Sequence, residues 1–172
     1  SVGETMAIGR TFKEALQKAL RGLEIRKDGW DAQGQTPPDV LRQRLAVPSA
    51  ERIFHLKEAF AAGLSLDEVF QLTKIDRWFL RQLYTLLLEE ETLKAAAEQM
   101  RSCADAAVGS AVQASAAELL RRAKRYGFSD RQLAKLWDLE ESTIRQWRSR
   151  WGIRPSYYLV DTCAAEFEAQ TP

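Results

Sequence analysis

Few residues of this 172-residue sequence have the types and spacing that chemistry requires. His55 is the single histidine, and the two cysteines, Cys103 and Cys163, belong to no Cys-x-x-Cys pair, so we expect no Cys/His zinc site. Because His55 lies between two apolar residues, we interpret it as a partly buried, hydrogen-bonded histidine and not as a catalytic base. Cys163 has no plausible histidine partner that could activate a thiol nucleophile. Two free thiols are typical of a reducing compartment.

Phosphate-binding loops and paired catalytic carboxylates are not indicated either. The nine glycines are scattered singly, and neither Gly-x-x-x-x-Gly-Lys nor Gly-x-Gly-x-x-Gly occurs. The acidic runs Asp67–Glu68 and Glu89–Glu91 are explained by a helix start and by a solvent-exposed helix face. The sequence therefore predicts no catalytic, cofactor-binding or metal-binding residue in this chain.

One segment does carry residue types that could read nucleic acid. Residues 128–153 have the spacing of a helix–turn–helix, with Leu133 on the first helix and with Ile144 and Trp147 facing inward on the second. The second helix, around Glu140–Trp151, would present Arg145, Gln146, Arg148, Ser149 and Arg150 outward. Residues 115–155 hold 10 basic and five acidic residues.

Two carboxylates weigh against a DNA-binding role for this segment. Glu140 and Glu141 open the second helix, at the end that approaches the DNA backbone, where they would repel phosphates. We therefore favour a helical pair packed in a bundle with a solvated basic face. A DNA-binding helix–turn–helix protein is the alternative.

Composition places these segments in an ordinary globular chain. The sequence is 28% charged and 45% hydrophobic, and its 25 basic residues balance 24 acidic ones, which excludes a histone-like or strongly acidic protein. The longest apolar stretch, Leu83–Leu88, is far too short to span a bilayer. No secretory signal is visible at the start, so we expect no membrane partner.

Helix starts are marked by four capping patterns, in which Glu or Gln follows Ser or Thr by three positions. They are Thr11–Glu14, Ser65–Glu68, Ser115–Glu118 and Ser129–Gln132. Further helices are expected over Asp39–Leu45, from a cap at Ser49 to Gly63, from Asp76 to about Met100, and over Glu140–Trp151. Trp78 lies on a strongly apolar helix and is predicted to be part of the core.

These elements predict a mostly α fold. We expect a helical bundle of about six or seven helices that contains two helix–turn–helix-like units, with extended segments at both ends, over residues 5–10 and from Tyr157 onward. Residues 25–38, which include Pro37–Pro38, are expected to form a loop or a joint. Small polar residues predict a second, flexible loop over residues 102–114.

The sequence also partly matches itself at an offset of 64 positions. Residues 63–65, Gly-Leu-Ser, align with residues 127–129, Gly-Phe-Ser, and Leu80 aligns with Ile144. Arg81–Gln82 aligns with Arg145–Gln146. The repeated pattern is a helix, a glycine stop, a capped short helix, a turn and a helix, which predicts two similar helical units around a joint core.

Sequence blocks that occur in one order along nearly the whole chain resemble the large chain of carbamoyl phosphate synthetase, in its central oligomerisation region. These blocks are Ser1–Glu4, Met6–Phe12, Gln17–Arg21, Ile75–Leu80, Gly127–Asp130, Gln132–Ala134, Gly152–Pro155 and Val160–Phe167. Where the family usually has a Val-Tyr-Lys-like stretch after the proline, this chain has Ser156–Leu159. Neither end has the polar tail of a natural terminus, so we expect the chain to be a piece of something longer.

The resemblance implies a three-part organisation. Residues 1–24 would be the end of the first synthetase (ATP-grasp) half, residues 25–155 the helical oligomerisation domain, and residues 156–172 the linker into the second half. The parent enzyme, a ligase, would make carbamoyl phosphate from bicarbonate, glutamine-derived ammonia and two ATP, for arginine and pyrimidine synthesis. The matched blocks are not the family's ATP, metal or regulator ligands.

The resemblance also implies the partners. It implies self-association, contact with both synthetase halves and, in the parent enzyme, a glutaminase small chain or domain. The parent would use ATP with magnesium or manganese, and potassium, whereas this chain would bind none of them. We expect no nucleic-acid partner, and a location in the cytoplasm, or in an organelle interior if the source is eukaryotic.

Overall fold

The computed structural model describes residues 4–31, 34, 36–103 and 110–159, and this part of the chain is helical, without a strand. The helices are α1 (Phe12–Gly22), α2 (Pro38–Ala46), α3 (Arg52–Ala61), α4 (Leu66–Thr73), α5 (Arg77–Ala95), α6 (Ala97–Ser102), α7 (Ser110–Arg125), α8 (Asp130–Trp137) and α9 (Glu141–Arg150). The predicted mostly α fold is confirmed. The described residues form nine helices where about six or seven were expected.

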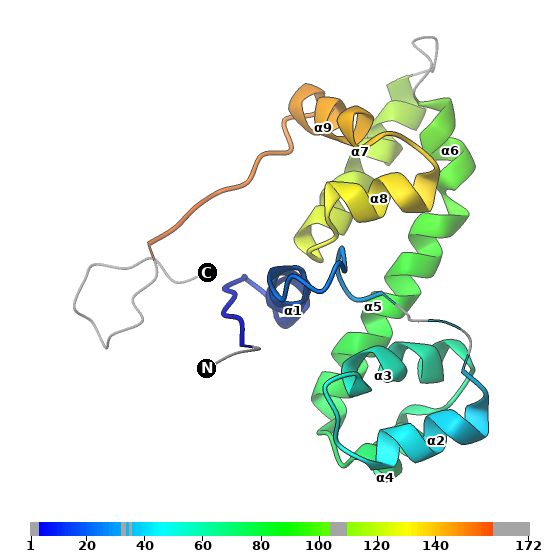
Figure 1. Cartoon of the computed structure of the whole chain (residues 1–172). Coiled ribbons are helices and arrows are strands. Elements are labelled where there is room, and N and C mark those ends of the chain that lie inside the picture. Colours follow the sequence, from blue (N-terminus) through cyan, green and yellow to red (C-terminus); the bar gives the residue numbers. More distant parts are fainter. Residues whose placement is uncertain (1–3, 32–33, 35, 104–109, 160–172) are drawn as a thin grey trace.

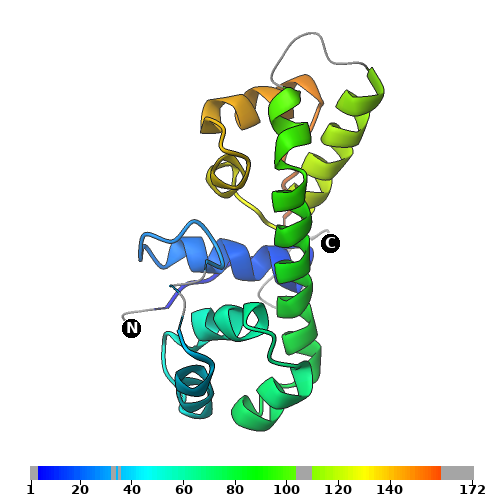
Figure 2. The same cartoon turned by 90° about the vertical axis from the view of Figure 1, so that its right-hand side faces the viewer.

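Helix α5 is the spine of the molecule (Figure 1). Its 19 residues extend over about 28 Å. Helices α2, α3 and α4 gather around its first half and form the lower unit, whereas α6 to α9 surround its other end and form the upper unit (Figures 1 and 2). Helix α1 crosses α5 near its middle, between the two units (Figure 2).

The two units repeat the same backbone turns, which confirms the internal repeat. Gly63 ends the first helix of one unit at a φ of +87°, and Gly127 ends its counterpart at +86°. Ser65 and Ser129 then cap α4 and α8 through complete capping boxes. Both short helices end on a left-handed residue that is not glycine, Lys74 in one unit and Asp138 in the other.

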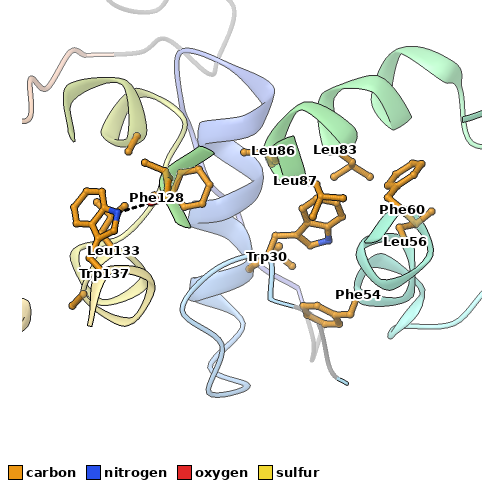
Figure 3. Packing of buried hydrophobic residues seen from close by; sticks show 14 of the residues in the cluster. Trp30, Phe54, Leu56, Phe60, Leu83, Leu86, Leu87, Phe128, Leu133 and Trp137 are labelled. Atoms are coloured by element: carbon orange, nitrogen blue, oxygen red, sulfur yellow. Dashed lines mark hydrogen bonds between the residues drawn. The ribbon is translucent and has the colours of Figure 1, made fainter. Parts of the chain in front are cut away.

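One cluster of buried apolar residues runs through both units, as predicted for a joint core, and it has a centre in each unit on a different stretch of α5 (Figure 3). Toward the lower unit, Trp30 lies beside Leu87 of α5, and Phe54 of α3 lies on the other side of Trp30. In the upper unit, Trp137 is fully buried beside Leu133, and its indole nitrogen donates a hydrogen bond of 2.9 Å to the carbonyl of Leu93 on α5. A single helix therefore contributes to both apolar centres, which fixes one unit relative to the other.

Several local expectations were wrong. Helix α7 begins at Ser110, so Ser115 lies inside a helix and is no cap, and residues 110–114 are helical rather than loop. Helix α3 begins at Arg52 after Glu51, without the side-chain cap predicted from Ser49. The helix expected to continue to about Met100 is interrupted at Ala96 and continues as α6. Residues 104–109 of the predicted loop lie outside the described residues.

The ends of the described chain agree with the prediction, whereas one tryptophan does not. Residues 4–10 and 153–159 are non-helical, as predicted, and form no strand; residues 160–172, with Cys163, lie outside the described residues. Trp78, predicted to be core, is 52% exposed because it lies on the side of α5 opposite the buried leucines. In the described part of the chain, no helix combines the length and apolarity needed to cross a membrane.

Candidate interaction surfaces

The segment that contains α1 and Trp30 joins the two units. The Gln17 side chain is 1% exposed; its amide donates to the Tyr126 carbonyl (3.1 Å), and its oxygen accepts from Gln132 Nε2 (3.0 Å). Arg21 donates to the carbonyl of Gly127 at 2.7 Å. These bonds fasten α1 to the turn between α7 and α8, where it meets the upper unit.

A buried ion pair fastens the same segment to the lower unit. The solvent-exposed face predicted for Glu89–Glu91 was therefore wrong for Glu89 and Glu90, which are buried. Lys57 is 5% exposed and donates to the Trp30 carbonyl (2.7 Å) and to a Glu90 carboxylate oxygen (2.5 Å). The Trp30 indole nitrogen donates to the carbonyl of Ile53 at 2.7 Å. Helices α3 and α5 both meet the segment around Trp30 at this point. The segment that contains α1 and Trp30 is therefore bound to the upper unit and to the lower unit.

Asp130, at the start of α8, is the centre of a second buried cluster. Its carboxylate accepts from Lys124 of α7 (2.8 Å) and from Arg148 of α9 (2.5 Å). Burial alone would raise the pKa of Asp130, but the bonds and charges of Lys124 and Arg148 outweigh burial and lower the pKa below its usual value. The carboxylate thus holds three helices of the upper unit together.

We expect an Asp130→Asn variant to be about 2 kcal/mol less stable at pH 7, because two partly buried cations lose their counter-charge. A carboxyl group with a lowered folded pKa contributes stability above its unfolded pKa of about 3.9, and this contribution is lost as pH falls through the folded value. The gap between wild type and variant is therefore expected to close below about pH 4, measured by urea unfolding across pH.

Asp138→Asn provides the control for this pH series. Asp138 is exposed, pairs with no cation in the described part of the chain and adopts the left-handed backbone conformation that asparagine also tolerates. It is expected to unfold like wild type at every pH. An Asp130→Asn deficit that stays constant down to pH 3 would show that the ion pairs are not its source.

The helix–turn–helix residues lie in α8 and α9, and no observation supports the DNA-binding alternative. Ile144 and Trp147 are buried, as predicted. Of the side chains predicted to reach a groove, however, Arg148 is held by Asp130, and Arg145 pairs with Glu141 of its own helix at 2.9 Å. The Arg148–Asp130 pair joins α9 to α8, and the Arg145–Glu141 pair lies within α9, so both fit the packed helical pair that the sequence favoured.

The candidate chemical groups do not assemble into a reactive site. His55 is buried as expected, but its Nδ1 atom finds no hydrogen-bond partner in the described structure, so the expectation of a satisfied histidine was wrong. Cys103 is a buried free thiol whose pKa is raised by burial, which makes it a poor nucleophile. Among the described residues, no three His, Cys, Asp or Glu side chains gather as metal ligands would.

The described residues leave one face of α5 largely uncovered, and we name this face the α5 stripe. It contains Trp78, Arg81, Thr85, Leu88, Thr92 and Ala95, which recur at alternating spacings of three and four residues. Trp78 is 52% and Leu88 50% exposed, and the stripe lies opposite the buried Leu80 and Leu83. This spacing is the one with which a helix meets a partner helix.

An aromatic group extends the stripe at its first turn. The ring of Phe12, from α1, packs edge-on against Trp78 and Phe79 of α5, with ring centroids 5.6 and 5.2 Å apart. Phe79 is itself 43% exposed. Large aromatic side chains that are rigidly held and exposed are typical anchors of protein interfaces.

A second surface is an open cleft of about 950 Å³ between α1, α7 and the chain after α9, named here the basic cleft. Its lining contains a single carboxylate, Glu14, among eight cationic side chains. These are Arg10, Lys18, Arg21, Arg121, Lys124, Arg125, Arg148 and Arg154. Five of these cations lie within residues 115–155, where the sequence shows a basic excess, but the other three come from residues 10–21, so no sequence pattern indicated that they form one cleft.

The fold and these surfaces define an all-α interaction domain: two similar helical units on one spine, with an exposed helix face. Comparison with known families agrees with this class. The family described as "Carbamoyl-phosphate synthetase large chain, oligomerisation domain" matches residues 4–152, and the chain belongs to this family. The family suggested by the sequence blocks is thereby confirmed.

Curated relatives carry the name carbamoyl phosphate synthase large chain. The protein from Archaeoglobus fulgidus is 44% identical over 175 residues, which cover all of this chain and 15% of that protein. Those from Thermotoga neapolitana and Pseudomonas aeruginosa are 46% and 43% identical, covering 100% and 99% of this chain and 14% and 15% of those proteins. The chain therefore spans about 15% of the length of the relatives it matches.

Proposed function

We propose that this chain is the non-catalytic oligomerisation and spacer domain within the large chain of a glutamine-dependent carbamoyl phosphate synthase. The observation that carries the proposal is the architecture: one helix is the spine of two units, α1 locks them together, and a face of that spine stays free. Such a body holds its neighbours at a fixed separation and offers a surface for a second copy.

The relatives' length supports a place inside a longer polypeptide. We propose that residues 1–24 end a first synthetase half, that residues 25–155 form the spacer and that residues 156–172 lead into a second half. The parent enzyme would then make carbamoyl phosphate from bicarbonate, glutamine-derived ammonia and two ATP, with a glutaminase small chain or domain as partner. Its location would be the cytoplasm.

ATP, magnesium or manganese, and potassium would bind outside this chain. The residues present do not fit these groups, because the sequence has no phosphate-binding glycine loop and the described residues offer no cluster of carboxylate, histidine or cysteine ligands. The contribution of this chain to the reaction is therefore positional. Rigid packing would keep the two synthetase halves in one relative arrangement.

Self-association would use the α5 stripe. A two-fold pair of copies buries the same patch on both, so each residue of the stripe meets the stripe of the partner. Leu88 is its half-exposed aliphatic centre, and Trp78 is its aromatic anchor at one end. The small and β-branched side chains of Thr85, Thr92 and Ala95 allow two helices to approach closely.

A Leu88→Glu variant tests this proposal, since it places a charge at the centre of the stripe. We expect wild-type mass in light scattering to rise with concentration toward that of a pair, and the variant to associate roughly 30-fold more weakly or more. Val47→Glu is the control, because Val47 is 64% exposed but lies after α2, away from the stripe. It is expected to associate like wild type.

The outcomes distinguish two claims: that this chain self-associates, and that it does so through the α5 stripe. A wild-type chain that stays monomeric at every concentration would contradict self-association through this domain alone. Association that Leu88→Glu leaves unchanged would mean that another face is used. Circular dichroism of both variants checks that the helices are intact, because each substitution is at an exposed position.

A further inference from the structure

The basic cleft carries an excess of positive charge that the described residues do not neutralise. Lys18 pairs with Glu14 and Arg121 with Glu118, each at 2.7 Å, while Lys124 and Arg148 share Asp130. The other four cations of the cleft form no ion pair in the described part of the chain. They are Arg10, Arg21, Arg125 and Arg154.

Part of this charge is held away from water. Burial lowers the pKa of the Arg21 guanidinium, and the nearby charges of Asp130, Asp28 and Glu14 offset only part of this effect. Burial also lowers the pKa of the Lys124 ammonium; Asp130 opposes this effect, whereas the nearby charges of Arg148 and Arg21 add to it. Partly buried cations that repel one another are a cost to the folded chain, and an anion placed in the cleft would relieve it.

The chain just before α1 and the chain after α9 both line this cleft. Residues 10–11, just before α1, and residues 153–158, after α9, are part of its lining. The Arg10 guanidinium donates to the Ser156 hydroxyl at 2.5 Å and lies over the ring of Tyr158, 4.8 Å from its centroid. In Figure 1 the segments before α1 and after α9 run on the same side of the molecule. A longer polypeptide would therefore enter and leave this domain beside the cleft.

We propose that the basic cleft seats an acidic surface element from a flanking part of the same polypeptide. This inference rests on the proposed function, which places the chain inside a longer one. The relatives extend far beyond this chain, so sequence on either side would emerge next to the cleft. The cleft opens between elements that are distant in sequence, and its charges are spread over them. That arrangement suits the carboxylates of a protein surface better than one small anion.

A photo-crosslinking amino acid in place of Arg125 in the full-length polypeptide tests this inference. Arg125 is exposed, lines the cleft and makes no ion pair in the described structure. The control carries the same amino acid in place of Arg44, an exposed arginine on α2, also without an ion pair, in the other unit. We expect Arg125 to crosslink to an Asp- and Glu-rich peptide of the same polypeptide, and Arg44 not to do so.

Charge reversal and isotope labelling complete the experiment. The crosslink is expected to disappear when Arg10 and Arg154, which are both exposed and line the cleft, are replaced by Glu, and to persist in the Leu88→Glu background, where self-association is weakened. Mixed labelled and unlabelled copies show whether it joins one polypeptide or two. A crosslink to a second copy, to nucleic acid or to a neutral peptide would overturn the inference, as would a yield no higher than that of Arg44. Because the crosslink is expected to persist in Leu88→Glu, the test of the cleft does not depend on self-association through the α5 stripe.

Discussion

A Gly127→Ala variant is expected to lose about 3 kcal/mol of stability and to release α1 from the upper unit. Gly127 has a φ of +86°, where an L side chain costs about 1 kcal/mol. An added Cβ would also lie 2.9 Å from the Glu14 Cα and 3.2 Å from the Gln17 Cβ of α1. Because backbone cannot swing away as a side-chain end can, α1 must move, which we estimate costs about 2 kcal/mol more.

The repeat supplies a matched control for this substitution. Gly63 has almost the same φ, +87°, but a Cβ there would meet nothing within 4 Å. Gly63→Ala is therefore expected to cost only about 1 kcal/mol of backbone strain. The difference between the two variants measures the contact of α1 with the upper unit, because both place alanine after the first helix of a unit.

Urea unfolding gives the two stabilities, and amide hydrogen exchange of α1 tests the mechanism. We expect α1 amides to exchange faster in Gly127→Ala, and to exchange as in wild type in Gly63→Ala. Equal losses in the two variants, with α1 equally protected, would mean that the close approach of α1 contributes little. In that case the two units would depend on α5 alone for their relative position.

Local signals in the sequence were sufficient for much of this fold. Ser65 and Ser129 were identified as caps because a hydroxyl and a Glu or Gln three positions later satisfy each other's backbone amides. The same pattern failed at Ser115 because residues 110–114 also form helix, so the helix was already under way. A capping pattern shows that a start is possible, and only the preceding residues decide whether it is used.

Trp78 shows the limit of apolar periodicity. The first turns of α5 are apolar on several faces, so the pattern identified the helix without showing which side meets the core. In the structure Leu80 is fully buried and Trp78 half exposed, and it is this exposure that creates the α5 stripe. The candidate surface therefore consists in part of a residue that sequence reasoning assigned to the interior.

The contacts that join the two units could not be predicted from the sequence, for a different reason. Gln17 meets Gln132, and Arg10 meets Ser156, across more than a hundred positions. Capping and periodicity report on neighbours in the chain and carry no information on which distant polar groups will pair. The basic cleft could be predicted only in part for the same reason: the basic excess of residues 115–155 is visible in the sequence, but the approach of Arg10, Lys18 and Arg21 to it is not.

The buried pair of Lys57 and Glu90 predicts the other large effect. We expect Lys57→Met to lose about 3 kcal/mol, because Glu90, 8% exposed, keeps only the half-exposed Lys94 and because the Trp30 carbonyl loses its donor. A double variant, Lys57→Met with Glu90→Leu, is expected to recover most of this loss, since two apolar side chains replace the pair without an unpaired charge.

Urea unfolding of the single and double variants, followed by the fluorescence of the five tryptophans, measures this coupling. Arg145→Met is the control: its partner is Glu141, the Arg145 side chain is 71% exposed, and we expect a loss below about 1 kcal/mol. A double variant no more stable than Lys57→Met would show that the cost comes from lost packing and not from the stranded carboxylate. Because Lys57 also donates to the Trp30 carbonyl, part of the loss is expected to persist in the double variant, with Trp30 becoming more exposed. The loss of stability that remains in the double variant would measure the contribution of the hydrogen bond from Lys57 to the Trp30 carbonyl, separately from that of the ion pair.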